Sequence, residues 1–270
     1  MVIQKIKRFG EREVKLLFAL EQENSPVFTI SHARKILGTG DASVKNVLKR
    51  LKKKHRIIAL QRGVYLFAPL KSGENGLWTE DAFRVAPSLV NGKGYYIGFI
   101  SAMNYWGMTE QLPVVVYVAL TSQKRNLRAV QANFIFVKKK RLGNFVPISL
   151  DGTEVNISSM EQTILDGLAF PQYCMGIGEV AKAIHFSRKK LDWEKLIRLA
   201  KQEKGAIRRR LGFLLELLGF KKHAKALNGH FSGFAWLDPT EQKAGFAYNK
   251  AWGLKINVEK RQTLEFLEGY

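Results

Sequence analysis

The sequence has little cysteine, few acidic side chains and no long apolar run. A single cysteine, Cys174, among 270 residues allows no disulfide within the chain, so nothing indicates an oxidising compartment. The five histidines have no ligand spacing with Cys174, which argues against a zinc site. The most apolar run, Leu112–Leu120, is too short to cross a bilayer. We therefore expect no metal site and no membrane span.

The N-terminus also lacks the features of a secretory signal. Charges interrupt the apolar residues of the first twenty positions, and no small-residue cleavage site follows them. The chain has no H-E-x-x-H pair, no Walker loop and no G-x-S-x-G elbow. We expect a cytoplasmic protein that is not an enzyme and that uses no cofactor.

Two weaker patterns point towards enzymes. Gly176–Ala181 has the spacing G-x-G-x-x-A, but a dinucleotide site needs this turn directly after a strand, and here it follows a predicted helix and a loop. We expect these glycines to start a helix instead. Five carboxylates could be arranged into a metal-dependent nuclease centre, although no pair has a diagnostic spacing with a lysine: Asp151, Glu154, Asp166, Asp192 and Glu194. A nuclease is the least favoured alternative.

Basic residues, in contrast, are abundant. Lys and Arg number 44 against 23 Asp and Glu, which gives a formal net charge of +21. Such a charge attracts polyanions, with nucleic acid as the first candidate partner and an anionic membrane surface as the second. Residues 1–70 hold 15 basic and 5 acidic side chains, a net charge of +10, so the first quarter of the chain carries about half of the excess.

A segment of turn-forming residues, Ala68–Gly76, divides the chain. We expect an N-terminal winged helix-turn-helix over residues 1–70 and a larger mixed α/β domain over residues 77–270, an α+β fold overall. The larger part contains strand-like runs, a hairpin with Asp151-Gly152 as its turn, and several helices after Ser159. Its final segment, around residues 250–260, alternates like a last strand.

The expectation of a winged helix rests on the order of elements in residues 1–70. Helices are predicted over residues 11–22, over a segment capped by Thr29 or Ser31, and from Asp41 onward as N-cap. The turn Gly38–Gly40 separates the second helix from the third. Two strand-like runs follow, joined at Arg62-Gly63. Apolar residues of the third helix recur at helical spacing: Val44, Val47, Leu48 and Leu51.

Polar residues cover the other faces of that third helix, where a recognition helix would meet the major groove. The residues expected to reach base edges are Ser43, Lys45, Asn46, Lys49 and Arg50. Those expected to contact the DNA backbone are Lys52, Lys53 and Lys54. Gln61 and Arg62 would form the tip of the wing. The alternative is a solvated helix face with a chance basic bias, but solubility explains neither the short turn nor the Arg-tipped hairpin.

Further basic runs occur in the second part: Lys138–Arg141, Arg188–Lys190, Arg208–Arg210 and Lys221-Lys222. Each run alone is typical of a solvated surface, and together they could extend a DNA footprint or hold an RNA. We expect Arg208, Arg209 and Arg210 as accessory basic residues. The helix around them is strongly apolar, so one or two of them could instead pair with a buried carboxylate such as Asp166.

Four segments, in this order, resemble the AbiEi-type antitoxins of type IV toxin–antitoxin systems: "VLKRLKKKHRIIALQRGVYLFAP", "YYIGFISAMNYWGMTEQLP", "ISSMEQTILDGLAFPQY" and "RRRLGFLLELLG". The resemblance covers about 200 residues and rests on order and spacing, because winged helices alone are common. Family members have a "GG" after the helix that contains "LD", and here Gly176-Ile177-Gly178 stands in its place.

The resemblance implies two activities. The winged helix would bind inverted repeats in its own promoter and repress it, and the C-terminal domain would oppose a co-encoded nucleotidyltransferase-like toxin without a stable complex. A winged-helix transcriptional regulator with a ligand-sensing or dimerising C-terminal domain and no toxin partner is the alternative. The residues themselves indicate only a basic, DNA-binding N-terminal part and a larger part with no evident active site.

Overall fold

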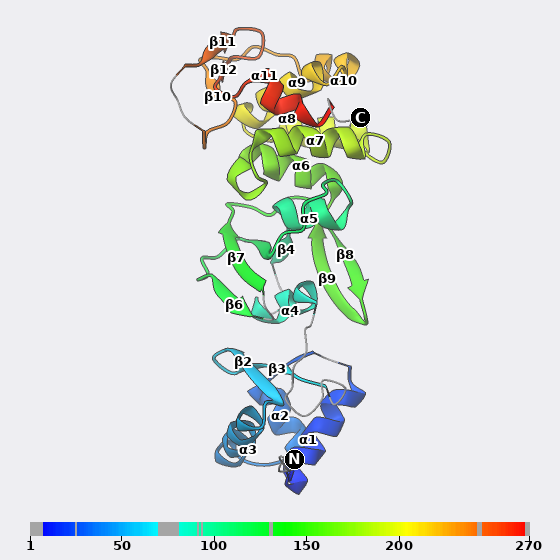
Figure 1. The fold of residues 1–270 in the computed structure, drawn as a ribbon, viewed down its shortest axis with the longest axis vertical. Coiled ribbons are helices and arrows are strands. Elements are labelled where there is room, and N and C mark those ends of the chain that lie inside the picture. The colour runs from blue at the N-terminus through cyan, green and yellow to red at the C-terminus, as the bar shows by residue number, and fades with distance from the viewer. Residues whose placement is uncertain are drawn as a thin grey trace, which may run out of the picture. The chain divides into compact units, whose positions relative to one another are not determined.

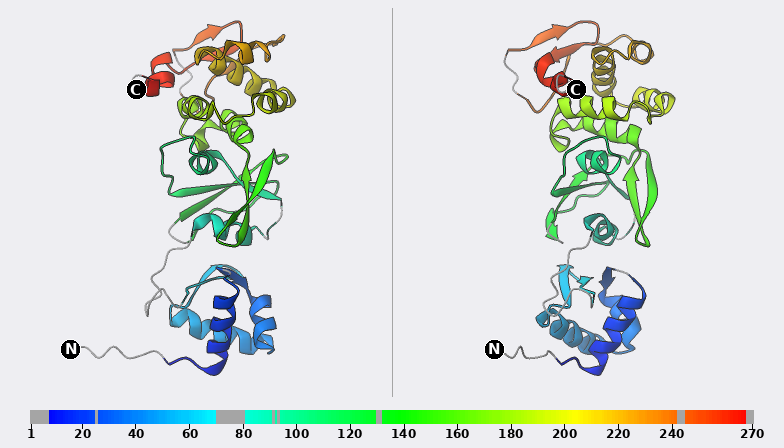
Figure 2. Two further views of the ribbon diagram at one scale, coloured as in Figure 1. Left: turned by 90° about the vertical axis from the view of Figure 1, so that its right-hand side faces the viewer. Right: turned by 45° about the vertical axis from the view of Figure 1, so that its right-hand side comes forward.

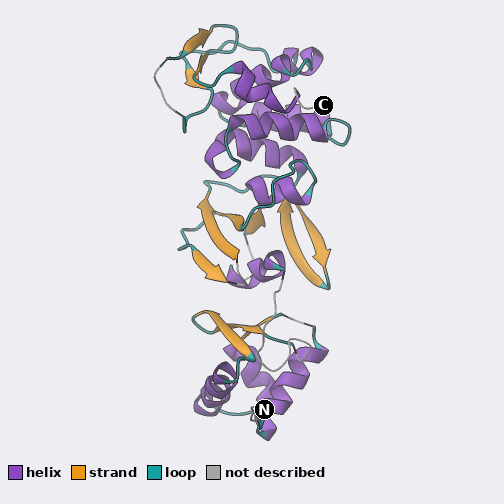
Figure 3. Cartoon of the chain, in the orientation of Figure 1, coloured by secondary structure: helices purple, strands orange, loops and turns teal. Residues whose placement is uncertain are grey.

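The computed structural model describes residues 8–24, 26–69, 81–90, 92, 94–129, 132–241 and 245–267. Over these residues the chain is a mixed fold of helices and three sheets (Figures 1 and 3), which confirms the prediction at that level. The chain divides into two compact units: residues 1–95, 127–133 and 147–155 form the first, and residues 96–126, 134–146 and 156–270 form the second. Most of the predicted divider, Ala68–Gly76, lies outside the described residues.

The N-terminal segment combines three helices with a small antiparallel sheet. Its elements are α1 (Glu11–Gln22), β1 (Val27–Thr29), α2 (Ile30–Leu37), α3 (Asp41–Lys53), β2 (Ile57–Gln61) and β3 (Val64–Phe67). The sheet has the order β1-β3-β2. Strand β1 was not predicted. It pairs with β3 through Phe28 and Tyr65, whose rings stack with centroids 5.6 Å apart.

Local chemistry explains the ends of these elements. Helix α1 has the predicted bounds, and Thr29 caps α2 by accepting a hydrogen bond from the His32 amide at 3.1 Å. The apolar faces of α1, α2 and α3 meet β2 and β3 in one core. Its fully buried members include Leu16, Leu20, Ala33, Val44, Val47, Leu51 and Ile57.

A six-stranded sheet with two helices follows. Its region contains α4 (Ala82–Leu89), β4 (Tyr95–Ile97), α5 (Phe99–Tyr105), β5 (Val115–Leu120), β6 (Leu127–Ala129), β7 (Ala132–Lys138), β8 (Phe145–Leu150) and β9 (Thr153–Ser158). The strand order is β6-β7-β5-β4-β9-β8. Asp151 and Gly152 have φ of 43° and 80°, the left-handed conformation that a tight hairpin needs, and the predicted β8–β9 turn is confirmed.

The second unit continues as a group of packed helices. They are α6 (Met160–Ala169), a 3₁₀ turn (Pro171–Tyr173), α7 (Ile177–Ser187), α8 (Trp193–Gln202), α9 (Gly205–Leu217) and α10 (Lys221–Lys225). Helix α6 contacts α5, α7, α8 and α9 (Figure 2). The predicted N-cap residues Ser159 and Asp192 accept hydrogen bonds from backbone amides of α6 and α8. Gly219, with φ of 86°, follows the C-cap of α9.

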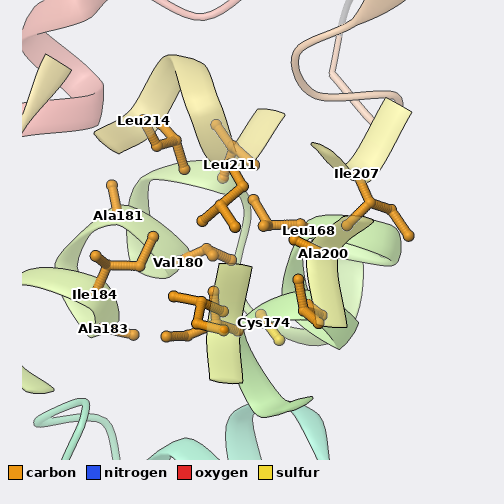
Figure 4. Packing of buried hydrophobic residues seen from close by; sticks show 14 of the residues in the cluster. Leu168, Cys174, Val180, Ala181, Ala183, Ile184, Ala200, Ile207, Leu211 and Leu214 are labelled. Atoms are coloured by element: carbon orange, nitrogen blue, oxygen red, sulfur yellow. The ribbon is translucent and has the colours of Figure 1, made fainter. Parts of the chain in front are cut away.

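The core of this unit lies where α6, α7 and α9 meet. Leu168, Val180 and Leu211 are fully buried there, and Cys174 lies among them (Figure 4). Because Cys174 is surrounded by apolar side chains, burial raises the pKa of its thiol well above the ordinary value. The cysteine is therefore a packing residue.

A small third sheet closes the described chain. It contains β10 (Ala235–Trp236), β11 (Ala247–Asn249) and β12 (Leu254–Ile256) in the order β10-β12-β11, and α11 (Lys260–Leu264) with a 3₁₀ turn (Glu265–Leu267) follows. The strand predicted near residues 250–260 corresponds to the short β12, whereas α11 was not predicted. Gly212 of α9 makes room for Trp252, because a Cβ there would lie 2.0 Å from the indole ring.

Candidate nucleic-acid interface

Helix α3 has one apolar face and one basic face, as its sequence predicts. Val44, Val47, Leu48 and Leu51 are buried in the core beneath it. The predicted base-contacting residues Lys45, Asn46, Lys49 and Arg50 are exposed, and so are Lys52 and Lys53. Because the apolar stripe fixes the helix against the core, the lysines stand together on its solvent side. The structure brings these predicted residues onto one helix.

A tight turn places α3 after α2. Gly38 adopts the left-handed conformation with φ of 63° at the C-cap of α2, and its amide donates to the Arg34 carbonyl at 2.9 Å. The prediction of Asp41 as the N-cap of α3 is wrong: Gly40 holds that position, and Asp41 is the first helical residue. Asp41 instead forms an ion pair with Arg34 across the turn, which joins the two helices.

Glu13 of α1 binds side chains at the end of α3, and this residue was not predicted from the sequence. Its carboxylate is 1% exposed and accepts hydrogen bonds from Arg50 Nε at 2.9 Å and Lys54 Nζ at 2.5 Å. Burial alone would raise the pKa of Glu13, but the hydrogen bond from Lys54 and those from the Gly10 amide and Arg50 outweigh burial and lower it. The one available signal was an acidic residue on a helix face otherwise formed by leucines.

These contacts separate the predicted residues into two groups. Lys54 is partly buried, holds Glu13 and also donates to the Arg8 carbonyl at 2.7 Å, so a structural role suits it better than a phosphate contact. Arg50 keeps a side-chain exposure of 56% despite its bond to Glu13. Ser43 is half-buried and accepts a hydrogen bond from Arg12 Nη1 at 2.7 Å. Lys45, Asn46 and Lys49 remain on the solvent side.

The hairpin β2–β3 carries the residues predicted for a wing. Gly63 has φ of 74°, the conformation that the predicted turn requires. Arg62 is exposed at this turn, and Gln61 is half-buried at the end of β2. A register shift between Ala59 and Gln61 marks an irregularity just before the turn.

The accessory residues of α9 are placed differently from the expectation. Arg209 and Arg210 are buried and donate to backbone carbonyls: Arg209 to Ser232, Gly233 and Gly253, and Arg210 to Leu168 and Trp236. Arg208 donates to the Leu227 carbonyl at 2.7 Å. These arginines satisfy carbonyls of the segments that follow α9 and, through Leu168, of α6, a structural role that the sequence run did not reveal.

The suggestion that one of these arginines pairs with Asp166 is wrong. Asp166 is buried and forms an ion pair with Lys139 instead, from the basic run after β7. Tyr96 Oη donates to Asp166 at 2.6 Å and Gln162 Nε2 donates at 2.8 Å. Burial, then the charge of Asp166, raises the pKa of the Tyr96 phenol well above its ordinary value. No sequence pattern predicted this group, because Tyr96 and Lys139 lie 70 and 27 residues away from Asp166 along the chain.

The two weaker patterns, the glycine spacing at Gly176–Ala181 and the five scattered carboxylates, do not correspond to an assembled enzymatic site among the described residues. Within those ranges no group of three or more His, Cys, Asp or Glu side chains could hold a metal ion. Gly176 is the N-cap of α7 and follows a 3₁₀ turn, as the helix-start prediction requires, whereas a dinucleotide site needs a strand there. In the described part of the chain, no helix has the length and apolar character needed to span a membrane.

Comparison with known proteins gives a structural likeness only. No family model matches the chain, and no curated protein matches it. The crystal structure of the RV2827C protein from Mycobacterium tuberculosis is similar, with a TM-score of 0.71 and 15% sequence identity, over 97% of this chain and 96% of that one. At this identity the likeness shows a shared fold along nearly the whole chain.

Proposed function

We propose that the chain is a DNA-binding transcriptional autorepressor and that its predicted N-terminal domain, residues 1–70, is a winged helix-turn-helix. The observation that carries the proposal is the exposed basic face of α3, held on a buried apolar stripe. The Gly38–Gly40 turn before α3 and the hairpin with Arg62 after it support the same reading.

Within this interface the exposed side chains divide by task. Lys45, Asn46 and Lys49 lie in the first nine residues of α3, the part of a recognition helix that reaches base edges. An asparagine suits adenine and a lysine suits guanine. Arg50 contributes to DNA binding while its guanidinium is hydrogen-bonded to Glu13, which fixes the direction of that group. Lys52 and Lys53 supply phosphate contacts, and Arg62 reaches the backbone from the wing.

The antitoxin part of the proposal rests on the resemblance described above. We infer that the chain represses a promoter with inverted repeats and opposes a co-encoded nucleotidyltransferase-like toxin without a stable complex. In a growth assay, expression of the neighbouring gene should arrest growth, and co-expression of this chain should restore it without co-purification. A neighbouring gene of another kind would favour a regulator with a ligand-sensing or dimerising second domain.

A gel-shift experiment tests the DNA-binding part. The full chain should retard the DNA upstream of its own gene at lower concentration than a scrambled duplex of equal length and composition. Equal retardation of both duplexes at every salt concentration would contradict sequence-specific repression. Incubation of plasmid and RNA with Mg²⁺ or Mn²⁺ tests the nuclease alternative, which cleavage by the purified chain would support.

A further inference from the structure

A cleft of about 550 Å³ lies in the second unit, between the loop after β7, helix α6 and the start of α9. Its volume falls within the range of small-molecule sites, roughly 300–1,000 Å³. One part of its lining is apolar, formed by Leu142, Leu165, Ala169, Phe170, Ala206 and Ile207. The other part is cationic, formed by Lys138, Lys139, Lys140, Arg141, Lys204 and Arg210.

The cleft keeps an excess of positive charge after its internal pairs are considered. Six basic side chains face two carboxylates, a net charge of +4. Asp166 compensates Lys139, and Glu203 lies 3.7 Å from Arg141. Lys138, Lys140 and Lys204 are exposed and line the cleft, the first two from the end of β7 and the loop after it and the third from the N-cap of α9.

Buried polar contacts hold one wall of the cleft in place. Lys139 bonds both Asp166 and Tyr96 Oη, and Gln162 donates to Asp166 and accepts from the Asn144 amide at 3.0 Å. Gly143 leaves the space that Gln162 needs, because a Cβ at this position would lie 2.1 Å from the Gln162 side chain. The segment that carries Lys138, at the end of β7, and Lys140, in the loop after it, is thus anchored to α6, so the backbone on this side of the cleft is fixed before any ligand arrives.

The start of α9 adds a helix terminus to the lysines. Helix α9 begins at Gly205 after Lys204, without a side-chain cap, and Ala206 and Ile207 of its first turn line the cleft. The positive end of a helix dipole favours an anion at this place. The lysines and the helix end therefore both add positive potential to a cleft that also has apolar lining.

We propose that this cleft binds a nucleotide. Its phosphates lie among Lys138, Lys140 and Lys204, and its base packs on the apolar side chains of Leu165, Phe170 and Ile207. Inorganic phosphate would leave the apolar half of the cleft unused, and a purely apolar ligand would leave the lysines unused. The cleft shares no residue with α3, so nucleotide binding can be tested independently of DNA binding.

Isothermal titration calorimetry on the full chain tests this proposal. The probes are the four common nucleoside triphosphates, inorganic tripolyphosphate and adenosine. We expect saturable binding of at least one triphosphate at about one per chain, and weaker binding of tripolyphosphate and adenosine, since each offers only half of the contacts. Tripolyphosphate binding as tightly as every nucleotide would overturn the assignment, and so would no saturable nucleotide binding.

Charge reversal locates the site. Lys140→Glu with Lys204→Glu should weaken nucleotide binding by at least about tenfold, because two charge-assisted contacts become repulsive. The matched control, Lys189→Glu with Lys190→Glu, changes the net charge equally at exposed positions outside the cleft and should alter affinity by less than about twofold. Equal losses in both variants would show general electrostatic attraction and reject the cleft. Retained gel-shift activity in the cleft variant separates this result from a failure of DNA binding.

Discussion

Glu13 joins helix α1 to the far end of helix α3 through two cationic partners. The Glu13 carboxylate is 1% exposed and has lost its hydrating water, and hydrogen bonds from Lys54 and Arg50 take the place of that water. The same two cations belong to the basic run that the sequence alone assigned to DNA. The run therefore has two tasks, since part of it holds the helices together and part of it faces solvent.

The first prediction concerns the charge of Glu13. Glu13→Gln should lower the local opening free energy of α1 and α3 by about 2 kcal/mol at pH 7, because two cations lose a buried charged acceptor. Amide hydrogen exchange of these helices in the full chain measures the change. Glu11→Gln, at an exposed position of the same helix, is the matched control and should be nearly neutral.

This effect depends on pH in a defined direction. The folded-state pKa of Glu13 lies below the ordinary value of 4.5, so its stabilisation is fully present above that value and is lost as pH falls through the folded pKa. The difference between wild type and Glu13→Gln should therefore shrink in acid. A difference that stays constant from pH 7 to pH 3 would contradict the account.

At the scale of elements, much of the fold follows from local signals. The bounds of α1, the Thr29 cap of α2, the turn at Gly63 and the Asp151-Gly152 hairpin were all predictable, because each depends on residues close in sequence. The role of Gly143 was not predictable, since it depends on Gln162 arriving from another element.

Other elements could not be predicted because their apolar residues follow no clear helical or strand period. Strand β4 has three consecutive buried residues, Tyr95–Ile97, and a short apolar run without alternation does not distinguish a strand from a helix. The run Arg208–Arg210 suggested a surface because arginine is usually exposed. The burial of Arg209 depends on the carbonyls of Gly233 and Gly253, which lie 24 and 44 residues further along the chain.

The second prediction concerns the turn between β8 and β9. Gly152 has φ of 80° and no atom would obstruct a Cβ there, so Gly152→Ala isolates the cost of backbone conformation. We expect a loss of about 1 kcal/mol in unfolding free energy. Gly152→Asn should recover much of it, because asparagine tolerates the left-handed region. Hydrogen exchange of the β8–β9 amides measures both variants, and equal losses for Ala and Asn would reject this explanation.

At the scale of the whole molecule, the net charge of +21 makes salt the main external variable. Charge alone produces attraction to any polyanion, so affinity without a salt series says little about the interface. The two proposed sites should differ in their salt dependence, since α3 would meet a long duplex and the cleft would take a ligand of limited charge.

The third prediction uses this dependence. Lys52→Ala with Lys53→Ala should lower the slope of log affinity against log salt by about 0.9 for each phosphate contact removed. Preference for the operator over a scrambled duplex should stay nearly unchanged, because phosphate contacts do not specify sequence. Titrations at several salt concentrations measure both quantities, and an unchanged slope would remove these lysines from the interface.

The exposed face of α3 is the central claim, and its most direct test is fluorescence anisotropy with the upstream DNA of the chain's own gene. Lys45→Ala with Lys49→Ala should weaken specific binding by at least about tenfold and reduce the preference over scrambled DNA, because each lost base contact costs about 1–3 kcal/mol. Lys189→Ala with Lys190→Ala removes the same charge elsewhere and should retain that preference. Unchanged specific affinity in the α3 variant, or an equal loss in the control, would contradict the account.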